Sequence, residues 1–369
     1  MSANKTILVT GAMGQLGKRV TAILLGRGHK VIALDLRNQA TLPVAAALQP
    51  GPGQPGELRP AFVNLLDAEA LRALLAEQRP GAIVHLAAVV APPCYKNPQF
   101  ARKVNVEGTH NLVEAAQALP QAPVFIQASS SSVYGSRNPH RHPERVTAQT
   151  PVNPVECYGE DKVAGERIVA ASGLPHALLR LGGIISPDGM SSTGPEYRVL
   201  TRATPGDNRI HAVDARDAAL AFANAAERGS AIDGKILLIG GNESYVLLER
   251  GLEDDLMQAL GIGRLGPSAS LPGDPGDDRG WGLTDWFDTT EAQALLEFQE
   301  HDWRQTLAWM AEAMGRKRLV VRALSPLLRM LMRAHFAAQR RREGRGPYAN
   351  PWALVSQHYG KQILAPTDF

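Results

Sequence analysis

The stretch KTILVTGAMGQLGKRVTAILL, Lys5–Leu25, decides the fold of this chain. Its beginning, KTILVT, is apolar and β-branched, which predicts a strand, and Lys18–Leu25 is compatible with a helix. Three glycines lie at the turn between them. Gly11 permits a tight turn, Gly14 leaves room for a pyrophosphate beside the backbone, and Gly17 lets the helix pack closely on the strand. The pattern predicts a dinucleotide-binding turn with the phosphates at the helix N-terminus.

A second predicted strand supplies evidence about the kind of dinucleotide. The run KVIAL, Lys30–Leu34, ends at Asp35, about 20 residues beyond the glycines. A carboxylate there can accept hydrogen bonds from both ribose hydroxyls of NAD and repels a 2′-phosphate. Arg37 can bind that phosphate or point to solvent, so NADP is the alternative. We expect NAD as the cofactor.

Composition and length predict a globular cytoplasmic protein. The chain is 44% hydrophobic over 369 residues, yet no apolar stretch approaches the roughly 18 residues of a membrane span. The first predicted strand begins too soon after Met1 for a secretion signal. Cys94 and Cys157 are the only cysteines, and the histidines lack metal-ligand spacing, so we expect no metal.

Strand-like and helix-like segments alternate along the first half of the chain. The runs ILVT, VIAL, AFVNL, AIVHLAA, VFIQASS and ALLRLGG are separated by amphipathic stretches such as Ala68–Gln78 and Val104–Leu119. This alternation predicts an α/β fold, a doubly wound parallel sheet of the Rossmann type. The alternation weakens beyond Ile185. We expect three parts: an NAD(P)-binding domain over 1–185, a smaller and mainly substrate-binding lobe over 186–315, and a basic C-terminal extension over 316–369.

Two helices are predicted late in the chain. Asp302 has N-cap chemistry for a helix over Trp303–Met314 that ends at Gly315. Ser325 followed by Pro326 has the N-cap and first-position chemistry of another helix.

Candidate catalytic residues follow the fifth predicted strand. Tyr158 and Lys162 are four positions apart, so on a helix both side chains project from one face. A phenol titrates near about 10, and a neighbouring ammonium favours the phenolate, which lowers that pKa toward neutral pH. Lys162 can also hold the nicotinamide ribose. The run VFIQA ends in Ser129–Ser132, at the sheet edge where ligands bind, so one of these hydroxyls can contact the substrate oxygen.

In combination these motifs resemble those of a known family. They are TGAMGQLG, Asp35, NLLD (Asn64–Asp67), HLAA (His85–Ala88), VNVEGT (Val104–Thr109), SSSSVYG and YGEDK. Over Thr6–Gly315 the chain resembles the extended short-chain dehydrogenases/reductases, which include NAD(P)-dependent epimerases, dehydratases and 3β-hydroxysteroid-type dehydrogenases.

The resemblance implies roles for individual residues. Ser130, four residues before Tyr134, is the implied substrate-binding hydroxyl, with Tyr158 as proton donor or acceptor and Lys162 as its partner. It also implies that Asn64 and Leu65 border the adenine, that Leu86, Ala87 and Ala88 line the cofactor, and that Asn105 steadies its site. The full set of expected cofactor-binding residues is Gly11, Met13, Gly14, Gln15, Leu16, Gly17, Asp35, Leu36, Arg37, Asn64, Leu65, Leu86, Ala87, Ala88, Asn105, Tyr158 and Lys162.

Other positions narrow the range of reactions that we expect this chain to catalyse. Family dehydratases commonly carry an Asp-Glu pair where this chain has Ser131 and Ser132, so dehydration is not expected. Only 33 residues separate Gly183 from Asp217, a short span for a sugar-nucleotide epimerase. Three arginines can bind a diphosphate or be solvated: Arg198, Arg202 and Arg209. We expect hydride transfer to or from an apolar, steroid- or terpenoid-like secondary alcohol or ketone. The alternatives are a sugar-nucleotide epimerase and a non-catalytic dinucleotide sensor or scaffold.

The last part of the chain is strongly basic. Arg316–Arg345 holds ten Lys or Arg and one acid, a local charge of +9, which leaves the remainder at −6 within the net +3. On a helix, Leu324 shares a face with Val320, Leu327, Leu328, Leu331 and Met332, and Arg322, Arg329 and Arg333 lie opposite. The apolar face can pack on the body, dock on a membrane surface or contact a second copy. The expected partners are a small-molecule substrate, a homodimer mate and, through this tail, a membrane surface, which would make the protein peripheral; no nucleic acid is expected.

Overall fold

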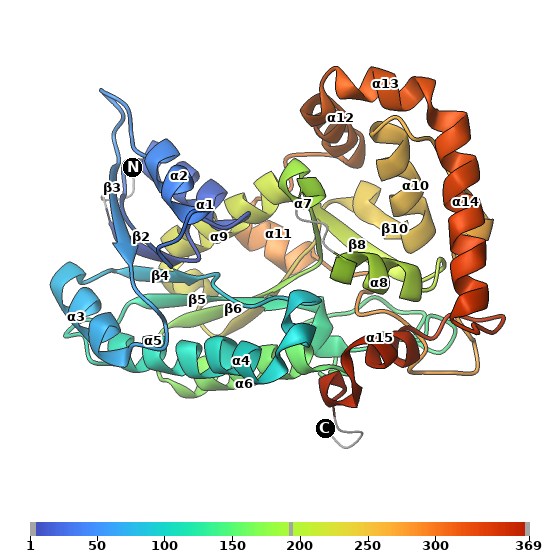
Figure 1. The fold of residues 1–369 in the computed structure, drawn as a ribbon. Coiled ribbons are helices and arrows are strands. Elements are labelled where there is room, and N and C mark those ends of the chain that lie inside the picture. Colours follow the sequence, from blue (N-terminus) through green and yellow to red (C-terminus); the bar gives the residue numbers. More distant parts are fainter. Residues whose placement is uncertain (1–4, 192–194, 366–369) are drawn as a thin grey trace.

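A seven-stranded parallel sheet forms the larger part of the fold (Figure 1). It lies within residues 5–191 and 195–365, which the computed structural model describes, and its strand order is β3-β2-β1-β4-β5-β6-β9. Its strands are β1 (Thr6–Thr10), β2 (Lys30–Asp35), β3 (Glu57–Phe62), β4 (Ala82–His85), β5 (Val124–Ser130), β6 (His176–Leu181) and β9 (Lys235–Ile239). The prediction of a Rossmann-type α/β fold is confirmed.

Helices cover both faces of this sheet because its strands are apolar on both sides. Ile7 and Val9 of β1 pack with one group of helices, while Leu8 between them packs with the other. The first group is α1 (Gly17–Gly26), α2 (Thr41–Ala47), α9 (Ala215–Arg228) and α11 (Thr290–Leu296). The second is α3 (Ala68–Gln78), α5 (Gly108–Gln117) and α6 (Cys157–Ala171). The chain reaches α5 through α4 (Pro98–Arg102) and a π-helical turn over Lys103–Glu107.

A smaller lobe is built on a second sheet, of order β10-β8-β7 among the described residues. Its strands are β7 (Gly183–Ile185), β8 (Arg209–Asp214) and β10 (Val246–Leu248). The remaining helices are α7 (Pro187–Ser191), α8 (Pro195–Ala203), α10 (Glu249–Ala259), α12 (Trp303–Met314), α13 (Lys317–Ala323), α14 (Ser325–Arg342) and α15 (Pro351–Tyr359). Because β9 pairs with β6 and α9 packs on α1, part of the chain beyond residue 185 belongs to the layers of the large sheet. The domain boundary at residue 185 stays a prediction.

Both late helices predicted from the sequence are present. The side chain of Asp302 accepts a hydrogen bond from the Gln305 amide at 2.7 Å, and α12 ends at Gly315, whose φ is 53°. α14 begins at Ser325, but its N-cap is Leu324 and no side chain caps it. The prediction that Ser325 is the N-cap is therefore wrong by one residue, because α13 runs almost directly into α14.

The basic tail contacts the body through arginines. Arg333 donates to the Leu265 carbonyl at 2.6 Å, and Arg340 donates to the Ser268 carbonyl at 3.0 Å. No residue of α13 or α14 is buried. Within the predicted apolar face, Leu328 and Met332 are half-buried, whereas Val320, Leu324, Leu327 and Leu331 are exposed. What the exposed part contacts stays a prediction. No helix of the described residues is both long and apolar enough to cross a bilayer.

Replacement of Gly17 by alanine should destabilise the fold. An added Cβ would lie 2.0 Å from the Gly11 carbonyl oxygen, so α1 must move away from β1 at a cost of about 1–3 kcal/mol in the free energy of unfolding. Urea denaturation measures this loss. Gly26→Ala is the matched control in the same helix, because its Cβ meets nothing within 4 Å and should leave the stability equal or slightly higher. Equal stability of the two variants would contradict the close approach.

Candidate active site

The glycine turn has the geometry that its sequence predicts. Gly11 has a φ of +64°, which favours glycine, and the main chain of Ala87 lies close beneath it. Gly17 touches the Gly11 carbonyl, so the start of α1 lies directly against the end of β1. No side chain caps the first turn of α1. The N–H groups of Lys18 and Arg19 donate to the Gly14 and Leu16 carbonyls at 3.1 Å. The positive end of the helix dipole at Gly17 still suits an anion such as a dinucleotide diphosphate.

Asp35 lies at the carboxyl end of β2 and is fixed by the backbone. Its carboxylate accepts hydrogen bonds from the amides of Met13 at 2.9 Å and Leu36 at 2.8 Å. Arg37 lies over the ring of Phe62, 5.6 Å from its centroid, and does not line the neighbouring cavity. The acid rather than the arginine therefore faces the place of the adenosine ribose, an arrangement that favours NAD.

A single cavity of about 560 Å³ joins the glycine turn to the expected catalytic residues. The predicted residues that line it are Gly11, Gly14, Gln15, Leu16, Gly17, Asp35, Leu36, Asn64, Leu65, Leu86, Ala87, Ala88, Ser130, Tyr158 and Lys162. Three predicted residues lie outside its lining: Met13, Arg37 and Asn105. Ser129, one of the four candidate hydroxyls, also lines it. The lining residues that were not predicted are Leu34, Val63, Leu66, Val89, Val90, Phe100, Val104, Ala128, Leu181, Gly182 and Ile184. Most are apolar, and only the assembled sheet brings them together.

The first turns of α6 place Tyr158 and Lys162 toward the end of β5. The ammonium of Lys162 lies 5.6 Å from the centroid of the Tyr158 ring and donates to the Ala128 carbonyl at 2.8 Å. Ser130 lines the same cavity, and its hydroxyl donates to Ser132 at 3.1 Å. Phenol, ammonium and hydroxyl thus share one wall of the cavity, which is the arrangement needed to move a proton to or from a substrate oxygen.

Burial dominates the electrostatics of this wall. It raises the pKa of Tyr158 above its usual value, and the Glu156 carboxylate raises that pKa further, whereas the nearby Ser130 side chain lowers it. Burial also lowers the pKa of Lys162 to about 8, against the opposing pull of the Glu166 and Asp161 carboxylates. The expected lowering of the phenol pKa by Lys162 is therefore outweighed here, because the buried phenolate loses the stabilisation that water gives it.

Asn105 acts on the cavity from outside. Its side-chain oxygen accepts from the Val89 amide at 2.8 Å, and its amide group donates to Asp161 at 3.2 Å. Val89 lines the cavity, and Asp161 precedes Lys162 in α6. Asn105 therefore ties the loop after β4 to the helix that carries Tyr158 and Lys162.

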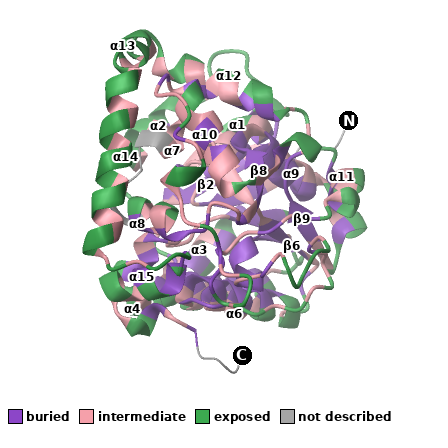
Figure 2. Ribbon diagram, turned by 90° about the vertical axis from the view of Figure 1, so that its right-hand side faces the viewer, coloured by how far each residue is buried: buried purple, intermediate pink, exposed green. Residues whose placement is uncertain are grey.

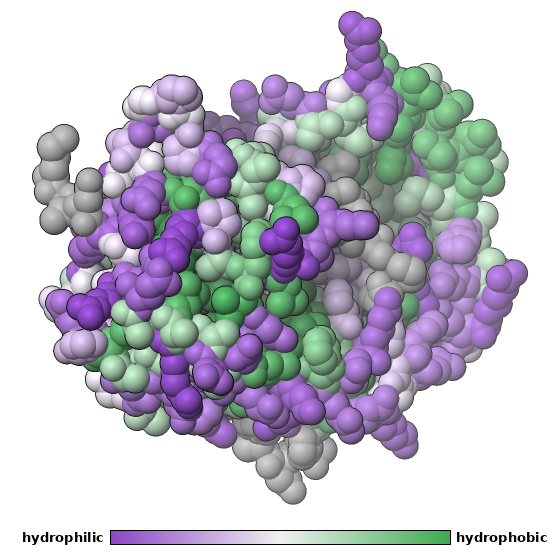
Figure 3. Space-filling view, turned by 60° about the vertical axis from the view of Figure 1, so that its left-hand side comes forward, coloured by the Kyte–Doolittle hydropathy of each residue, from purple (hydrophilic) through white to green (hydrophobic). Residues whose placement is uncertain are grey.

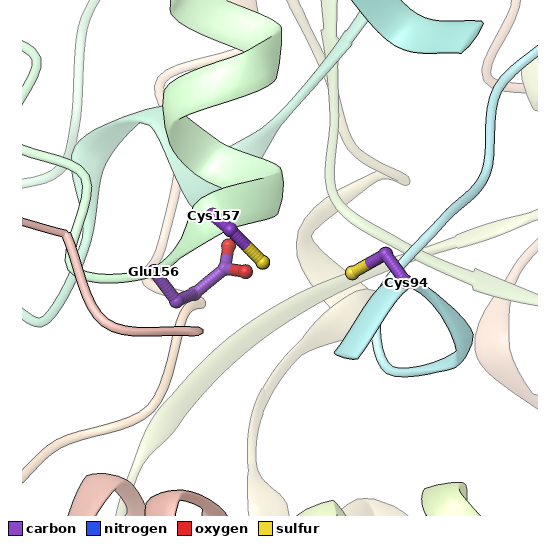
Figure 4. Close-up of side chains that lie close together, drawn as sticks. All are labelled: Cys94, Glu156 and Cys157. Carbon is purple, nitrogen blue, oxygen red and sulfur yellow. The ribbon is translucent and has the colours of Figure 1, made fainter. Parts of the chain in front are cut away.

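A second polar cluster supports Tyr158 from behind. The sulfur atoms of Cys94 and Cys157 and a carboxylate oxygen of Glu156 lie within 4.8 Å of one another (Figure 4). Among the described residues, this is the one group of three or more His, Cys, Asp or Glu side chains close enough together to hold a metal ion. Each oxygen of Glu156 already accepts a backbone N–H, from Tyr158 and Gly159, at 2.7 Å. A hydrogen bond with Cys157 and burial raise the pKa of the Cys94 thiol, which keeps it neutral. The cluster caps α6, and the absence of a metal cofactor stays a prediction.

Two of the three arginines considered for a diphosphate are engaged within the protein. Arg202 pairs with Glu343 at 2.8 Å. Arg209 lies over the Trp286 ring, 4.5 Å from its centroid, and its guanidinium is 3.6 Å from Asp285. Arg198 is exposed.

Comparison with known proteins identifies related chains. A UDP-glucose 4-epimerase of Mycolicibacterium smegmatis is 35% identical over 160 residues, 43% of this chain and 48% of that protein. The methionine adenosyltransferase 2 subunit beta of Bos taurus is 30% identical over 181 residues, 48% of this chain and 46% of its own. The chain thus spans about half the length of the curated relatives it matches.

Solved structures share the fold over most of the chain. MoeE5, in complex with UDP-glucuronic acid and NAD, has a TM-score of 0.63 and 25% identity, covering 85% of this chain and 99% of its own. A double mutant of DesIV, a dTDP-glucose 4,6-dehydratase from Streptomyces venezuelae with NAD bound, has a TM-score of 0.67 and 23% identity, covering 85% and 98%. Both structures hold the dinucleotide that Asp35 predicts for this chain.

A family assignment follows from a match over more than half of the sequence. The pattern of the NAD dependent epimerase/dehydratase family covers residues 7–240, from β1 to the end of β9. This range includes the glycine turn, Asp35 and all three residues of the predicted triad. The chain belongs to the NAD-dependent epimerase/dehydratase family, within the extended short-chain dehydrogenases/reductases that its motifs resemble.

Proposed function

We propose that this protein is an NAD-dependent oxidoreductase that transfers a hydride between the nicotinamide and a carbinol or carbonyl carbon, while Tyr158 transfers the proton. One observation carries the proposal: Ser130, Tyr158 and Lys162 line the same cavity as the glycine turn and Asp35. The uncapped start of α1 suits the diphosphate of NAD and Asp35 suits its ribose hydroxyls, so the residues present match this cofactor. Bound NAD supplies the hydride acceptor or donor.

The residues of the wall have separate tasks. Because burial keeps the Tyr158 phenol protonated, it is ready to donate a proton to the oxygen of a ketone that is being reduced. In the direction of alcohol oxidation, the Ser130 side chain lowers the pKa of the phenol and so favours the phenolate that accepts the proton. Lys162 is charged below about pH 8, and its ammonium also favours the phenolate. We also assign to Lys162 the role of binding the nicotinamide ribose.

The substrate that we propose is an apolar secondary alcohol or ketone of steroid or terpenoid type. Apolar side chains near the triad support this choice, among them Val89, Val90 and Ile184. The internal contacts of Arg202 and Arg209 also support it, because they leave these guanidinium groups less able to hold a sugar-nucleotide diphosphate.

A sugar-nucleotide epimerase is the second candidate. The UDP-glucose 4-epimerase of M. smegmatis and the UDP-glucuronic acid complex of MoeE5 favour it. In this reaction the hydride leaves and returns within one site, and the same triad serves. Arg198 remains exposed and able to contact an anion.

Absorbance of reduced nicotinamide, measured with steroid, terpenoid and aryl alcohols and with UDP- and dTDP-sugars, tests the proposal. We expect stoichiometric NADH from an apolar alcohol, and Tyr158→Phe should lower that turnover by about 10²–10⁴-fold while NADH binding is retained. Tyr348→Phe, at an exposed tyrosine, is the matched control. Sugar turnover without net NADH would establish the epimerase instead. NAD binding without any turnover would favour a sensor or scaffold, and full activity of Tyr158→Phe would refute the assigned role.

Asp35→Asn should change the choice of cofactor. The substitution keeps an acceptor for the Met13 amide but removes the charge that repels a 2′-phosphate. We expect the ratio of kcat/KM for NADP to that for NAD to rise by about tenfold or more, which corresponds to roughly 1.4 kcal/mol. Arg37→Ala serves as control and should leave the ratio unchanged, because Arg37 does not line the cavity. The opposite pattern would assign the preference to Arg37.

Glu156→Gln should move the pH profile of alcohol oxidation. Oxidation needs the Tyr158 phenolate, so the rate rises as pH rises toward the pKa of the phenol. The Glu156 carboxylate, whose own pKa burial raises to about 7, increases that phenol pKa once it is ionised. Its removal should therefore shift the rising limb of kcat/KM to lower pH, while Glu160→Gln in the same helix turn leaves the limb in place. A rate lowered equally at every pH would show that Glu156 only caps α6.

A further inference from the structure

Helices α13 and α14 present an apolar face to solvent. We call this the outer face; it consists of Leu319, Val320, Leu324, Leu327, Met330 and Leu331. Each of these side chains is 50–68% exposed. Figure 2 shows both helices with exposed and intermediate residues only, at the edge of the molecule. Figure 3 shows hydrophobic side chains gathered at the upper right, at the height where Figure 1 places α13 and the start of α14. Large apolar patches on a protein surface mark sites of interaction.

The body of the protein fixes this orientation. Three arginines on the other side of the two helices donate to backbone carbonyls: Arg318 to Ala259 at 2.7 Å, Arg333 to Leu265 at 2.6 Å, and Arg340 to Ser268 at 3.0 Å. An amphipathic helix on a globular domain normally turns its apolar stripe inward. Here the side that carries these arginines, together with half-buried Leu328 and Met332, is held against the body. The outer face therefore stays exposed unless something outside the chain covers it.

Both ends of the outer face are cationic. No Asp or Glu occurs from Arg316 to Arg342, a stretch with nine Lys or Arg. Arg316, Lys317 and Arg322 are exposed near its first end, and Arg341 and Arg342 are exposed at the C-terminal end of α14, ten residues beyond Leu331. An apolar strip between basic ends is complementary to a bilayer with anionic headgroups, because the leucines enter the acyl boundary while the basic groups remain among the phosphates.

A second copy of the chain is a poorer complement to this surface. Parallel or antiparallel pairing of two outer faces would bring a basic end against a basic end, and no acidic residue of the stretch could compensate the charge. The charge pattern therefore selects an anionic lipid surface over self-association.

We propose that the outer face of α13 and α14 docks the protein on an anionic bilayer, with both helices lying in the plane of the headgroups. The inference concerns where the protein acts and does not depend on the reaction in the NAD cavity. It requires no spanning helix, since the buried apolar strip reaches only the boundary between headgroups and acyl chains.

Cosedimentation with lipid vesicles tests the proposal on the full chain. We expect binding to vesicles of phosphatidylcholine with phosphatidylserine, weak binding to phosphatidylcholine alone, and weaker binding as salt concentration rises. The double variant Leu327→Ser/Leu331→Ser should lose at least about tenfold in partition coefficient. The double variant Arg341→Ser/Arg342→Ser should lose about fivefold in partition coefficient for each charge removed, and only with anionic vesicles.

Controls separate docking from misfolding and from self-association. Leu42→Ser, at an exposed leucine of α2, should bind vesicles like the unaltered protein, and all variants should keep their unfolding temperature and NADH affinity. Equal binding of the Leu327→Ser/Leu331→Ser variant, or no binding of the unaltered protein to anionic vesicles, would overturn the proposal. Sedimentation analysis that finds a dimer abolished by the same two substitutions would overturn it in favour of a second copy.

Discussion

The contact between Gly17 and the carbonyl of Gly11 is the constraint on which the rest of the site depends. It brings the N-terminus of α1 against the carboxyl end of β1, with no room for a side chain between them. The same turn packs on the main chain of Ala87, at the end of β4. Because β4 pairs with β5, whose end carries Ser130, the position of the phosphates and the position of the proton-transferring residues are linked through adjacent strands. A change in the turn would therefore alter the distance between a bound nicotinamide, which exchanges the hydride, and Tyr158, which exchanges the proton.

Burial gives the catalytic wall its chemical character. The same loss of solvent raises the pKa of the Tyr158 phenol, which keeps it neutral, and lowers the pKa of Lys162. Two nearby carboxylates raise the pKa of different groups in this wall. Glu166, which accepts from Arg180 at 2.6 Å and 2.8 Å, raises the pKa of Lys162, while Glu156 caps α6 and raises the pKa of the phenol. The pKa of Tyr158 is thus set first by burial and is raised further by the carboxylate that caps α6.

Local sequence patterns predicted the parts of the structure that depend on local geometry. The glycine turn, Asp35 and the Tyr158–Lys162 pair could be found because each role requires a particular residue at a fixed spacing. The apolar lining, such as Val90 and Ile184, could not be found, since ordinary valines and isoleucines enter a cavity only once the strand order is known. The pairing of β9 with β6 in the large sheet could not be predicted either, because hydrophobic periodicity does not state which strand lies beside which.

The tail shows how far periodicity can be taken. It placed Val320, Leu324, Leu327 and Leu331 on one face, and these are exposed. It also placed half-buried Leu328 and Met332 there, and it could not tell which side contacts the body. That choice is made by backbone carbonyls from Ala259 to Ser268, which lie at the end of α10 and in the turns after it and need donors that an apolar stripe does not have. A buried carbonyl without a partner is costly, whereas an exposed leucine costs little by itself. Arg318, Arg333 and Arg340 therefore turn toward these carbonyls. Leu328 and Met332 are half-buried beside them, and Leu327 and Leu331 are left on the exposed side.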